Sequence, residues 1–235
     1  MSNDSNNQKT VLICGDSFGV TDPDFPDLHF SEKILNVTPP VFELHNLCNG
    51  GDSNGLIALQ LMQGLQFNPG FVILLFTTPH RCKMDKDTRV YYPTEISLPA
   101  LKTFRHDRYA TTCYVTDKTS ENSKLINDWN TKIVSDDFEI LKNYFLMHYC
   151  FQLLEKHNIP FCYSVGGMTS TNYPTVIDKN FIKNYLNDYN TQALKINLWN
   201  YKSTNRRPYF HVEDEEVQSA FANECLYHLR NAKIV

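Results

Sequence analysis

Four short apolar runs constrain the fold of this 235-residue chain more than any other feature. They comprise residues 10–14, 41–47, 71–76 and 160–165. Each is followed by Gly, Thr or Ser, a pattern typical of strands that are covered on both faces in a parallel sheet. The chain therefore needs helices on both sides of such a sheet, and the segments between the runs should supply them.

Helical patterns lie between and after these runs, at residues 28–35, 54–67, 136–158 and 214–229. Ser53 suits the N-cap of the second pattern, which is apolar nearly all round. Single-face stripes are present in the last two, formed by Phe138, Leu141, Phe145, Tyr149 and Leu153 and by Val217, Phe221, Cys225 and Leu229. The alternation of strand and helix predicts a three-layer α/β/α sandwich with a central, mainly parallel sheet of the flavodoxin-like kind.

Domain organisation follows from polarity along the chain. Residues 1–9 are polar and predict a disordered lead-in, and residues 10–235 show no repeat and no convincing boundary, so we expect a single domain. Two polar segments, around 82–131 and 166–205, are too long for plain loops. We expect them to be insertions above the carboxyl edge of the sheet, where α/β proteins place their sites.

Composition excludes several classes of protein. The net charge of −4 and the lack of a basic run argue against binding to nucleic acid. The longest apolar run is too short to span a membrane, and the first residues do not resemble a secretory signal, so we expect a soluble, cytoplasmic protein. Seven cysteines without CxxC spacing, among them Cys14, Cys48 and Cys162, indicate buried hydrophobic residues in a reducing compartment. Eight histidines without metal-binding spacing predict no metal site.

The turn after the first run carries the candidate chemistry. Gly15, Asp16 and Ser17 follow the strand directly, so the Ser17 hydroxyl lies at the carboxyl edge of the sheet. Two interpretations are open: the hydroxyl caps the next helix, or it is a nucleophile. A serine nucleophile needs a base within hydrogen-bond reach, and His211 immediately precedes the last helical pattern. A lone histidine is more often structural, so position alone does not decide.

Taken together, these blocks resemble the SGNH, or GDSL-type, hydrolases. "GDSFG" near the start, "NLCNGGDSN" after the second strand and a histidine before the last helix match the order of that family's motifs, and "GGDSN" is similar to divergent members encoded by bacteriophages. The resemblance implies Ser17 as the nucleophile, His211 as its base, and an oxyanion hole formed by the amides of Ser17 and Gly51. It implies no organic cofactor.

Two blocks depart from the family pattern. The family carries Gly-x-Asn-Asp after the third strand, whereas this chain has "FTTPHR", so Thr78 stands at the position of the oxyanion-binding asparagine. The family's last block is Asp-x-x-His, whereas Pro208 stands three residues before His211. A backbone carbonyl or a carboxylate such as Asp178 or Asp188 would have to orient the imidazole, or the enzyme works as a Ser17–His211 dyad.

Several further residues are candidates for the site. Asp16 is expected to cap or brace the turn, with direct chemistry or substrate contact as the alternative. His80 and Arg81 follow the third strand, where Arg81 could bind a carboxylate or phosphate, although a solvated pair of loop residues is the simpler interpretation. Asn54 suits a helix start but could point into the site.

Three functions stay open on the sequence. The first is an ester or acyl hydrolase acting on a small-molecule or carbohydrate ester. The second is an inactive binding or structural protein, such as a phage particle component. The absence of the family's Asn and Asp from their usual places favours this function. The third, a phosphate- or nucleotide-binding flavodoxin-like protein, is weak because "GDSFG" lacks the GxxxxGK[ST] pattern. The aromatic content leaves room for a homo-oligomer or a virion assembly.

Overall fold

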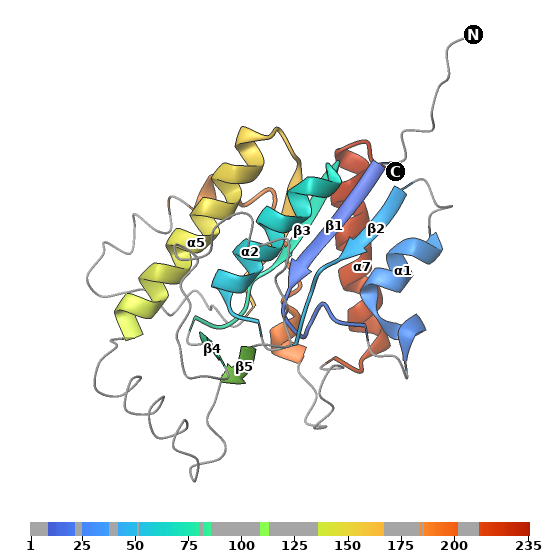
Figure 1. The fold of residues 1–235 in the computed structure, drawn as a ribbon. Coiled ribbons are helices and arrows are strands. Elements are labelled where there is room, and N and C mark those ends of the chain that lie inside the picture. Colours follow the sequence, from blue (N-terminus) through green and yellow to red (C-terminus); the bar gives the residue numbers. More distant parts are fainter. Residues whose placement is uncertain are drawn as a thin grey trace.

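The core of the molecule is a parallel sheet with helices packed against it, as the computed structural model in Figure 1 shows. The structure describes residues 9–21, 25–37, 42–50, 52–79, 82–85, 109–112, 136–166, 184, 186–201 and 212–235. The sheet has four strands in the order β2-β1-β3-β6, and every pairing is parallel. The strands are β1 (Lys9–Gly15), β2 (Phe42–Asn46), β3 (Phe71–Leu75) and β6 (Phe161–Ser164). All four agree with the predicted runs.

Burial of β1, β3 and β6 explains why their sequences are largely apolar, whereas the edge strand β2 is only partly buried and carries Glu43, His45 and Asn46. In β1 every residue after Lys9 is buried, and β3 and β6 are buried along their whole length. Alternate residues of β1 point to opposite faces of the sheet, so Val11 and Ile13 join one apolar cluster while Leu12 and Cys14 join another. The sheet is therefore covered on both faces, as the sequence predicts.

Among the described residues, helices cover both faces of the sheet (Figure 1). Helices α1 (Phe30–Val37) and α7 (Glu215–Asn231) contact each other over one face, where Phe30 and Phe221 meet edge to face with ring centroids 4.9 Å apart. Helices α2 (Asn54–Gly64) and α5 (Asp136–Lys156) contact each other over the opposite face. The result is the predicted α/β/α sandwich.

The ends of the helices agree with their sequence signals only in part. Asp214 is the N-cap of α7, and its carboxylate accepts hydrogen bonds from the backbone N–H groups of Glu216 and Val217. Ser53 occupies the N-cap position of α2 as predicted, but its side chain makes no capping hydrogen bond. Helix α2 ends in the short 3-10 helix η2 (Leu65–Phe67). The positions of these helices are thus confirmed, and the capping chemistry only for α7.

The buried face of α5 differs from the predicted stripe. Phe145 and Tyr149 belong to that stripe and are 63% and 42% exposed, whereas Tyr144, Met147 and Phe151 are buried against the sheet. In an α-helix, steps of four residues rotate by roughly 40° beyond a full turn, so a stripe built on successive fours drifts away from one face. The buried residues alternate steps of four and three and stay on it. The predicted face of α5 was therefore wrong.

The 166–205 segment is part of the sandwich at its described positions. The backbone N–H of Tyr163 donates to the Gln192 carbonyl at 3.0 Å, and the N–H of Leu194 donates to the Tyr163 carbonyl at 2.8 Å. This parallel bridge covers the outer edge of β6. The chain then reaches the 3-10 helix η6 (Leu198–Tyr201), whose Leu198 is buried. At its described positions the segment therefore packs against the edge of the sheet.

The remaining described elements lie outside the main sheet. Strands β4 (Cys82–Asp85) and β5 (Tyr109–Thr112) form an antiparallel pair within the predicted 82–131 insertion, and the 3-10 helix η1 (Pro26–Leu28) precedes α1. The predicted lead-in, apart from Lys9, lies outside the described residues. None of the described helices is both long enough and apolar enough to cross a membrane.

Candidate functional site

The Ser17 turn stands at the carboxyl end of β1. The Asp16 carboxylate accepts a hydrogen bond from the backbone N–H of Phe18 at 3.0 Å, and the Asp16 carbonyl accepts one from Gly19 at 3.0 Å. A Cβ on Gly19 would collide with the Cys48 side chain, so only glycine fits where this turn crosses the loop after β2. Asp16 thus braces the turn, as expected, and Ser17 is held in it with 3% of its surface exposed.

The structure removes the helix-cap interpretation of Ser17. The first helix to follow is the 3-10 helix at Pro26–Leu28, whose N-cap is Phe25, and α1 begins only at Phe30. Residues 17–20 form turns and bends rather than a helix, so Ser17 is not the N-cap residue of either helix.

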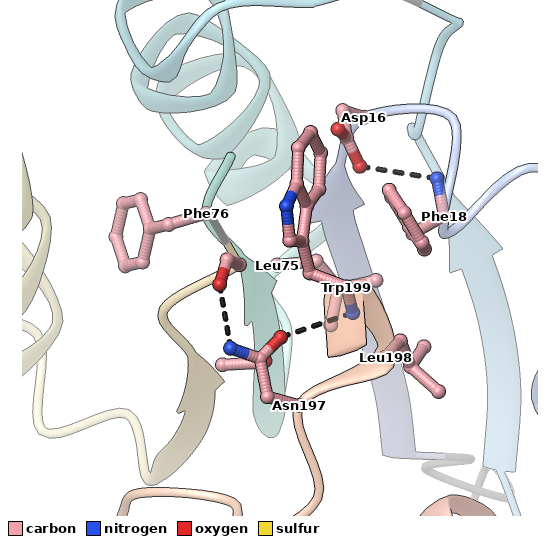
Figure 2. A pocket seen from close by; sticks show the side chains of 9 residues that line it. Asp16, Phe18, Leu75, Phe76, Asn197, Leu198 and Trp199 are labelled. Carbon is pink, nitrogen blue, oxygen red and sulfur yellow. Dashed lines mark hydrogen bonds between the residues drawn. The ribbon is translucent and has the colours of Figure 1, made fainter. Parts of the chain in front are cut away.

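A small pocket, partly open to solvent, lies beside this turn. Figure 2 shows its residues, which come from the carboxyl ends of three strands and from η6. Phe18 and Trp199 contact each other with ring centroids 5.1 Å apart. The Asn197 amide donates to the Gly166 carbonyl at 2.5 Å, and its oxygen accepts from the backbone N–H of Trp199 at 3.0 Å, which holds the backbone that carries the indole. The walls of the pocket are mostly apolar, with Asp16, Ser164 and Asn197 as polar residues.

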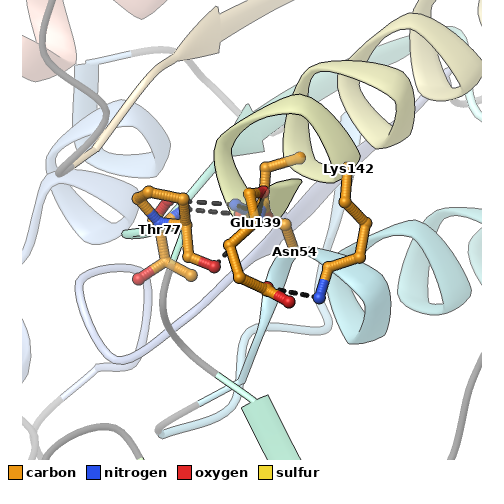
Figure 3. Close-up of polar contacts among 6 residues, drawn as sticks. Asn54, Thr77, Glu139 and Lys142 are labelled. Carbon is orange, nitrogen blue, oxygen red and sulfur yellow. Dashed lines mark hydrogen bonds and ion pairs between the residues drawn. The ribbon is translucent and has the colours of Figure 1, made fainter. Parts of the chain in front are cut away.

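The peptide after β3 is held by a second polar cluster, shown in Figure 3. Asn54, the first residue of α2, donates to the Thr77 carbonyl at 3.0 Å and accepts from the Thr77 N–H at 2.7 Å. It also donates to the Asn143 side chain of α5 at 2.6 Å, and Asn143 donates to the Pro79 carbonyl at 2.9 Å. One turn before Asn143, Glu139 forms an ion pair with Lys142. Two helices thus fix the backbone on either side of Thr78.

These contacts assign a role to Asn54 that the sequence did not show. Its amide holds the Thr77 peptide, which makes it a positioning residue for the segment that carries Thr78. Direct contact between Asn54 and a substrate stays a prediction. Thr78 itself is 5% exposed at the carboxyl end of β3, on the same edge of the sheet as Ser17.

The loop after β2 is tied to the Ser17 turn by a third cluster. The Gln60 side chain of α2 makes hydrogen bonds to both the N–H and the carbonyl of Gly15, at 2.7 and 3.0 Å. The same amide donates to the Asp52 carboxylate at 2.7 Å, and the other oxygen of Asp52 accepts from the Asn49 amide at 2.9 Å. Both Gln60 and Asp52 are buried, so this cluster replaces the solvent that those polar groups have lost.

Four of the predicted site residues, Gly51, His80, Arg81 and His211, lie outside the described residues. Their chain neighbours are described. Val212 is buried in the same apolar cluster as Phe18, and its carbonyl accepts a hydrogen bond from Gln218 at 2.9 Å. The oxygen of Gln218 in turn accepts from the Phe30 N–H at 3.0 Å. The start of α7 is thus anchored to the start of α1.

The described part of the 166–205 segment places one of the two carboxylates considered for orienting His211. Tyr189 packs against Phe161 at the amino end of β6, whereas Asn197 reaches Gly166 beyond its carboxyl end. The segment therefore runs alongside β6 in the same direction, and Asp188 lies exposed at the end of the sheet opposite to Ser17. The other candidate, Asp178, lies outside the described residues.

Two titratable groups near the turn, His29 and Cys48, are held in their neutral forms. Burial lowers the pKa of His29 to about 4, although the hydrogen bond to the Phe18 carbonyl acts in the opposite direction and raises it. Desolvation by burial is the main cause that raises the pKa of the Cys48 thiol well above its ordinary range, and electrostatic repulsion from Cys14, Asp16 and Asp52 raises it further. Cys14, Cys48 and Cys162 are free thiols, as predicted. A Cys48 thiol that stays protonated is a poor nucleophile, and a histidine with a pKa of about 4 is a weak base at neutral pH, so neither group suits a nucleophilic site.

Sequence reasoning missed Gln60, Asp52, Asn143 and His29. Gln60 offered a signal, because it stands in an otherwise apolar run at the centre of α2. Asn143 offered none, since its partners Asn54 and Pro79 lie far away along the chain. Asp52 and His29 offered none either, although their partners are closer in sequence. Among the described residues no group of three or more His, Cys, Asp and Glu side chains is placed to hold a metal ion.

Comparison with known proteins decides the fold. No family model and no curated protein matches the sequence. The esterase EstA from Pseudoalteromonas sp., solved inhibited by monoethylphosphonate, matches with a TM-score of 0.50 and 11% identity over 95% of this chain and 97% of its own. TesA matches with a TM-score of 0.50 and 10% identity over 95% and 99% of the two chains. This chain has the SGNH-hydrolase fold.

A further solved structure matches with a lower TM-score and carries no argument here. A GDSL-like lipase from Bacteroides thetaiotaomicron has a TM-score of 0.45 and 9% identity, over 97% of this chain and 92% of its own. At these identities the likeness concerns the fold alone. The SGNH-hydrolase fold nevertheless agrees with the family resemblance of the "GDSFG" block, which the turn at Ser17 carries.

Proposed function

We propose that the protein is a serine ester hydrolase in which Ser17 is the nucleophile and His211 its base. One observation carries the proposal: Ser17 stands in a braced turn at the carboxyl end of the central strand β1, within the SGNH-hydrolase fold. In open α/β sheets ligands bind at this edge. The neighbour EstA is an esterase that was solved inhibited by a phosphonate, which is in keeping with serine chemistry on this fold.

The proposed reaction is acyl transfer to Ser17. His211 takes the Ser17 proton while the oxygen attacks an ester carbonyl, and the alcohol leaves with a proton returned by the imidazolium. Water, activated by the same imidazole, then releases the acid and frees the serine. The amides of Ser17 and Gly51 would stabilise the oxyanion, with the Thr78 hydroxyl as a third donor.

Thr78 and Pro208 predict that the reaction is slow. In serine hydrolases the loss of one oxyanion donor costs about 10²- to 10³-fold in kcat, and a hydroxyl reaches less far than a carboxamide. The clusters at Asn54 and Gln60 hold the neighbouring backbone in place, which supports the expectation that the remaining oxyanion donors are well positioned. We therefore propose a dyad enzyme that acts on small-molecule or carbohydrate esters, with His80 and Arg81 as further candidates for substrate binding.

A second candidate function is an inactive scaffold with the same fold, such as a component of a phage particle. The observation that favours it is the replacement of the family's asparagine by Thr78, which is 5% exposed, in a segment held by buried amides. Such a protein would act through surface contacts, with a second copy of itself or within a virion, and Ser17 would be unreactive.

Labelling with a fluorophosphonate probe separates the two candidates. We expect covalent labelling on Ser17, located by mass spectrometry of the digested protein, together with hydrolysis of p-nitrophenyl acetate. Ser17→Ala should abolish both, and His211→Ala should slow both by about 10³-fold or more. Ser53→Ala is the matched control, since Ser53 is a nearby serine outside the proposed machinery, and it should label like the wild type.

The opposite result is equally clear. A wild-type protein that has the circular dichroism of a folded α/β domain, yet leaves Ser17 unlabelled by the probe, would overturn the hydrolase in favour of the scaffold. Labelling of Ser17 that survives in His211→Ala at the wild-type rate would instead remove His211 as the base.

A further inference from the structure

Gln60 is an unusual residue for its place in the fold. It lies in the middle of α2, is 2% exposed, and has the buried residues Leu59 and Leu61 on either side. A buried amide without partners costs about 1–3 kcal/mol compared with one that is satisfied, and an apolar side chain of the same length would fill the space without that risk. The partners of Gln60 therefore show what the amide does.

The three hydrogen bonds of the Gln60 amide all go to groups beside the candidate site. Its oxygen accepts from the Gly15 N–H at 2.7 Å, and its nitrogen donates to the Gly15 carbonyl at 3.0 Å and to Asp52 at 2.7 Å. A carboxamide nitrogen has two hydrogens, and these two contacts use both. The side chain thus clamps both the N–H and the carbonyl of Gly15, at the end of β1 and two residues before Ser17.

Asp52 extends the clamp to the loop after β2. Its side chain is fully buried, and its second oxygen accepts from the Asn49 amide at 2.9 Å. The backbone N–H of Asn49 donates to the Gly15 carbonyl at 3.2 Å, and the N–H of Asp52 donates to the Asn49 carbonyl at 3.2 Å. A closed ring of hydrogen bonds therefore joins Gly15, Gln60, Asp52 and Asn49.

We propose that Gln60 and Asp52 are positioning residues that set the separation between the Ser17 turn and the loop carrying Gly51. The inference rests on the proposed function, because only a reaction that uses both segments is sensitive to that separation. Oxyanion donors act by being fixed in advance, and a displacement of about 1 Å can cost 10²-fold in rate. Hydrogen bonds to a carboxylate are stronger than those between neutral groups, which stiffens the ring at Asp52.

The first test removes the clamp. Gln60→Met keeps the length of the side chain and deletes its polar atoms. We expect kcat for p-nitrophenyl acetate and the rate of Ser17 labelling to fall in parallel by roughly 10- to 100-fold, with KM changed by less than about twofold. Gln63→Met, a half-buried glutamine on the same helix, is the matched control and should leave both rates unchanged.

A loss of stability alone has a different signature. Ile57→Val destabilises α2 at a fully buried position away from the ring, so it should lower the unfolding midpoint and leave kcat of the folded protein unchanged. If Gln60→Met does not fold, Asp52→Asn keeps the shape of the side chain, turns one acceptor of the ring into a donor, and should lower kcat at least about fivefold.

Restoring the hydrogen bond with its polarity reversed tests the pairing itself. Gln60→Glu places two carboxyl groups together and should lower kcat strongly. Combining it with Asp52→Asn lets the new asparagine donate to the new glutamate, so the double variant should recover at least about threefold over Gln60→Glu alone. No recovery, or Gln60→Met with kcat within twofold of the wild type, would overturn this inference while leaving an active hydrolase. A wild-type protein without labelling would instead overturn the proposed function.

Discussion

His29 connects the Ser17 turn to α1 through a buried neutral ring. Its side chain is 1% exposed, with Nε2 at 3.2 Å from the Phe18 carbonyl and Nδ1 at 2.7 Å from the Ser31 hydroxyl. A carbonyl can only accept, so the hydrogen is on Nε2, and Nδ1 accepts from Ser31. Protonation of Nδ1 would place a positive charge in a buried layer and would force the Ser31 hydroxyl to accept; the desolvation of that charge by burial lowers the pKa of His29 to about 4.

This histidine predicts how stability depends on pH. Its pKa is about 4 in the folded protein and about 6.5 when unfolded, so protons bind more tightly to the unfolded chain. The contribution of the neutral ring is fully present above about pH 6.5 and is lost as pH falls toward 4, by roughly 3 kcal/mol. Urea unfolding at several pH values should show the loss, and His29→Gln should show correspondingly less of it. Equal slopes in the two proteins would contradict the assignment.

The cluster at Asn54 predicts a large cost for a small change. Asn54→Ala leaves the Thr77 N–H and carbonyl, both in a fully buried residue, without their side-chain partner. We expect the free energy of unfolding to fall by roughly 2–4 kcal/mol, measured by urea titration. Asn190→Ala removes an exposed asparagine and should change it by less than about 0.5 kcal/mol. Similar values for the two variants would mean that the cluster contributes little.

Among the elements, strands were predicted better than helix faces. The four strands were found because each is an apolar run that ends at a polar or glycine residue, and a strand buried on both faces leaves no face to choose. Helix α5 was located, but apolar residues lie nearly all round it, so its periodicity could not show which side meets the sheet. Only the contacts with β3 and β6 select Tyr144, Met147 and Phe151.

Two aromatic residues of α5 test this assignment of its faces. Phe151 is fully buried against Phe76, Phe161, Tyr163 and Tyr189, so Phe151→Ala should lower the free energy of unfolding by about 3–5 kcal/mol. Phe145 is 63% exposed, so Phe145→Ala should change it by about 1 kcal/mol or less. Chemical denaturation of both variants measures the difference. A cost at Phe145 that matches Phe151 would show that the exposed face is covered in solution.

For the whole molecule, the sequence could predict where a site lies but not how it is held. The carboxyl ends of parallel strands share one edge, so Ser17 and Thr78 were expected to come to the same side of the sheet, and they do. The ring through Gln60 and Asp52 and the bridge between Asn54 and Asn143 join residues that are distant in sequence or lie on different elements. No local pattern encodes such partners, because the packing of α2 against β1 and α5 creates them.

The order of the sheet predicts how the whole molecule opens. Strand β1 lies between β2 and β3, and its residues Leu12 and Ile13 are fully buried, so their amides should exchange with solvent only when the protein unfolds globally. Amides at the outer edge of β2 should exchange faster through local opening. The bridge at Tyr163 predicts that the Leu194 amide is as slow as those of β6, although it lies in a segment without regular structure on either side. Hydrogen exchange followed by nuclear magnetic resonance measures all three. If the Leu194 amide exchanged as fast as the exposed turn at residues 190–191, the bridge would not close that edge in solution, and β6 would be open to pairing with another chain.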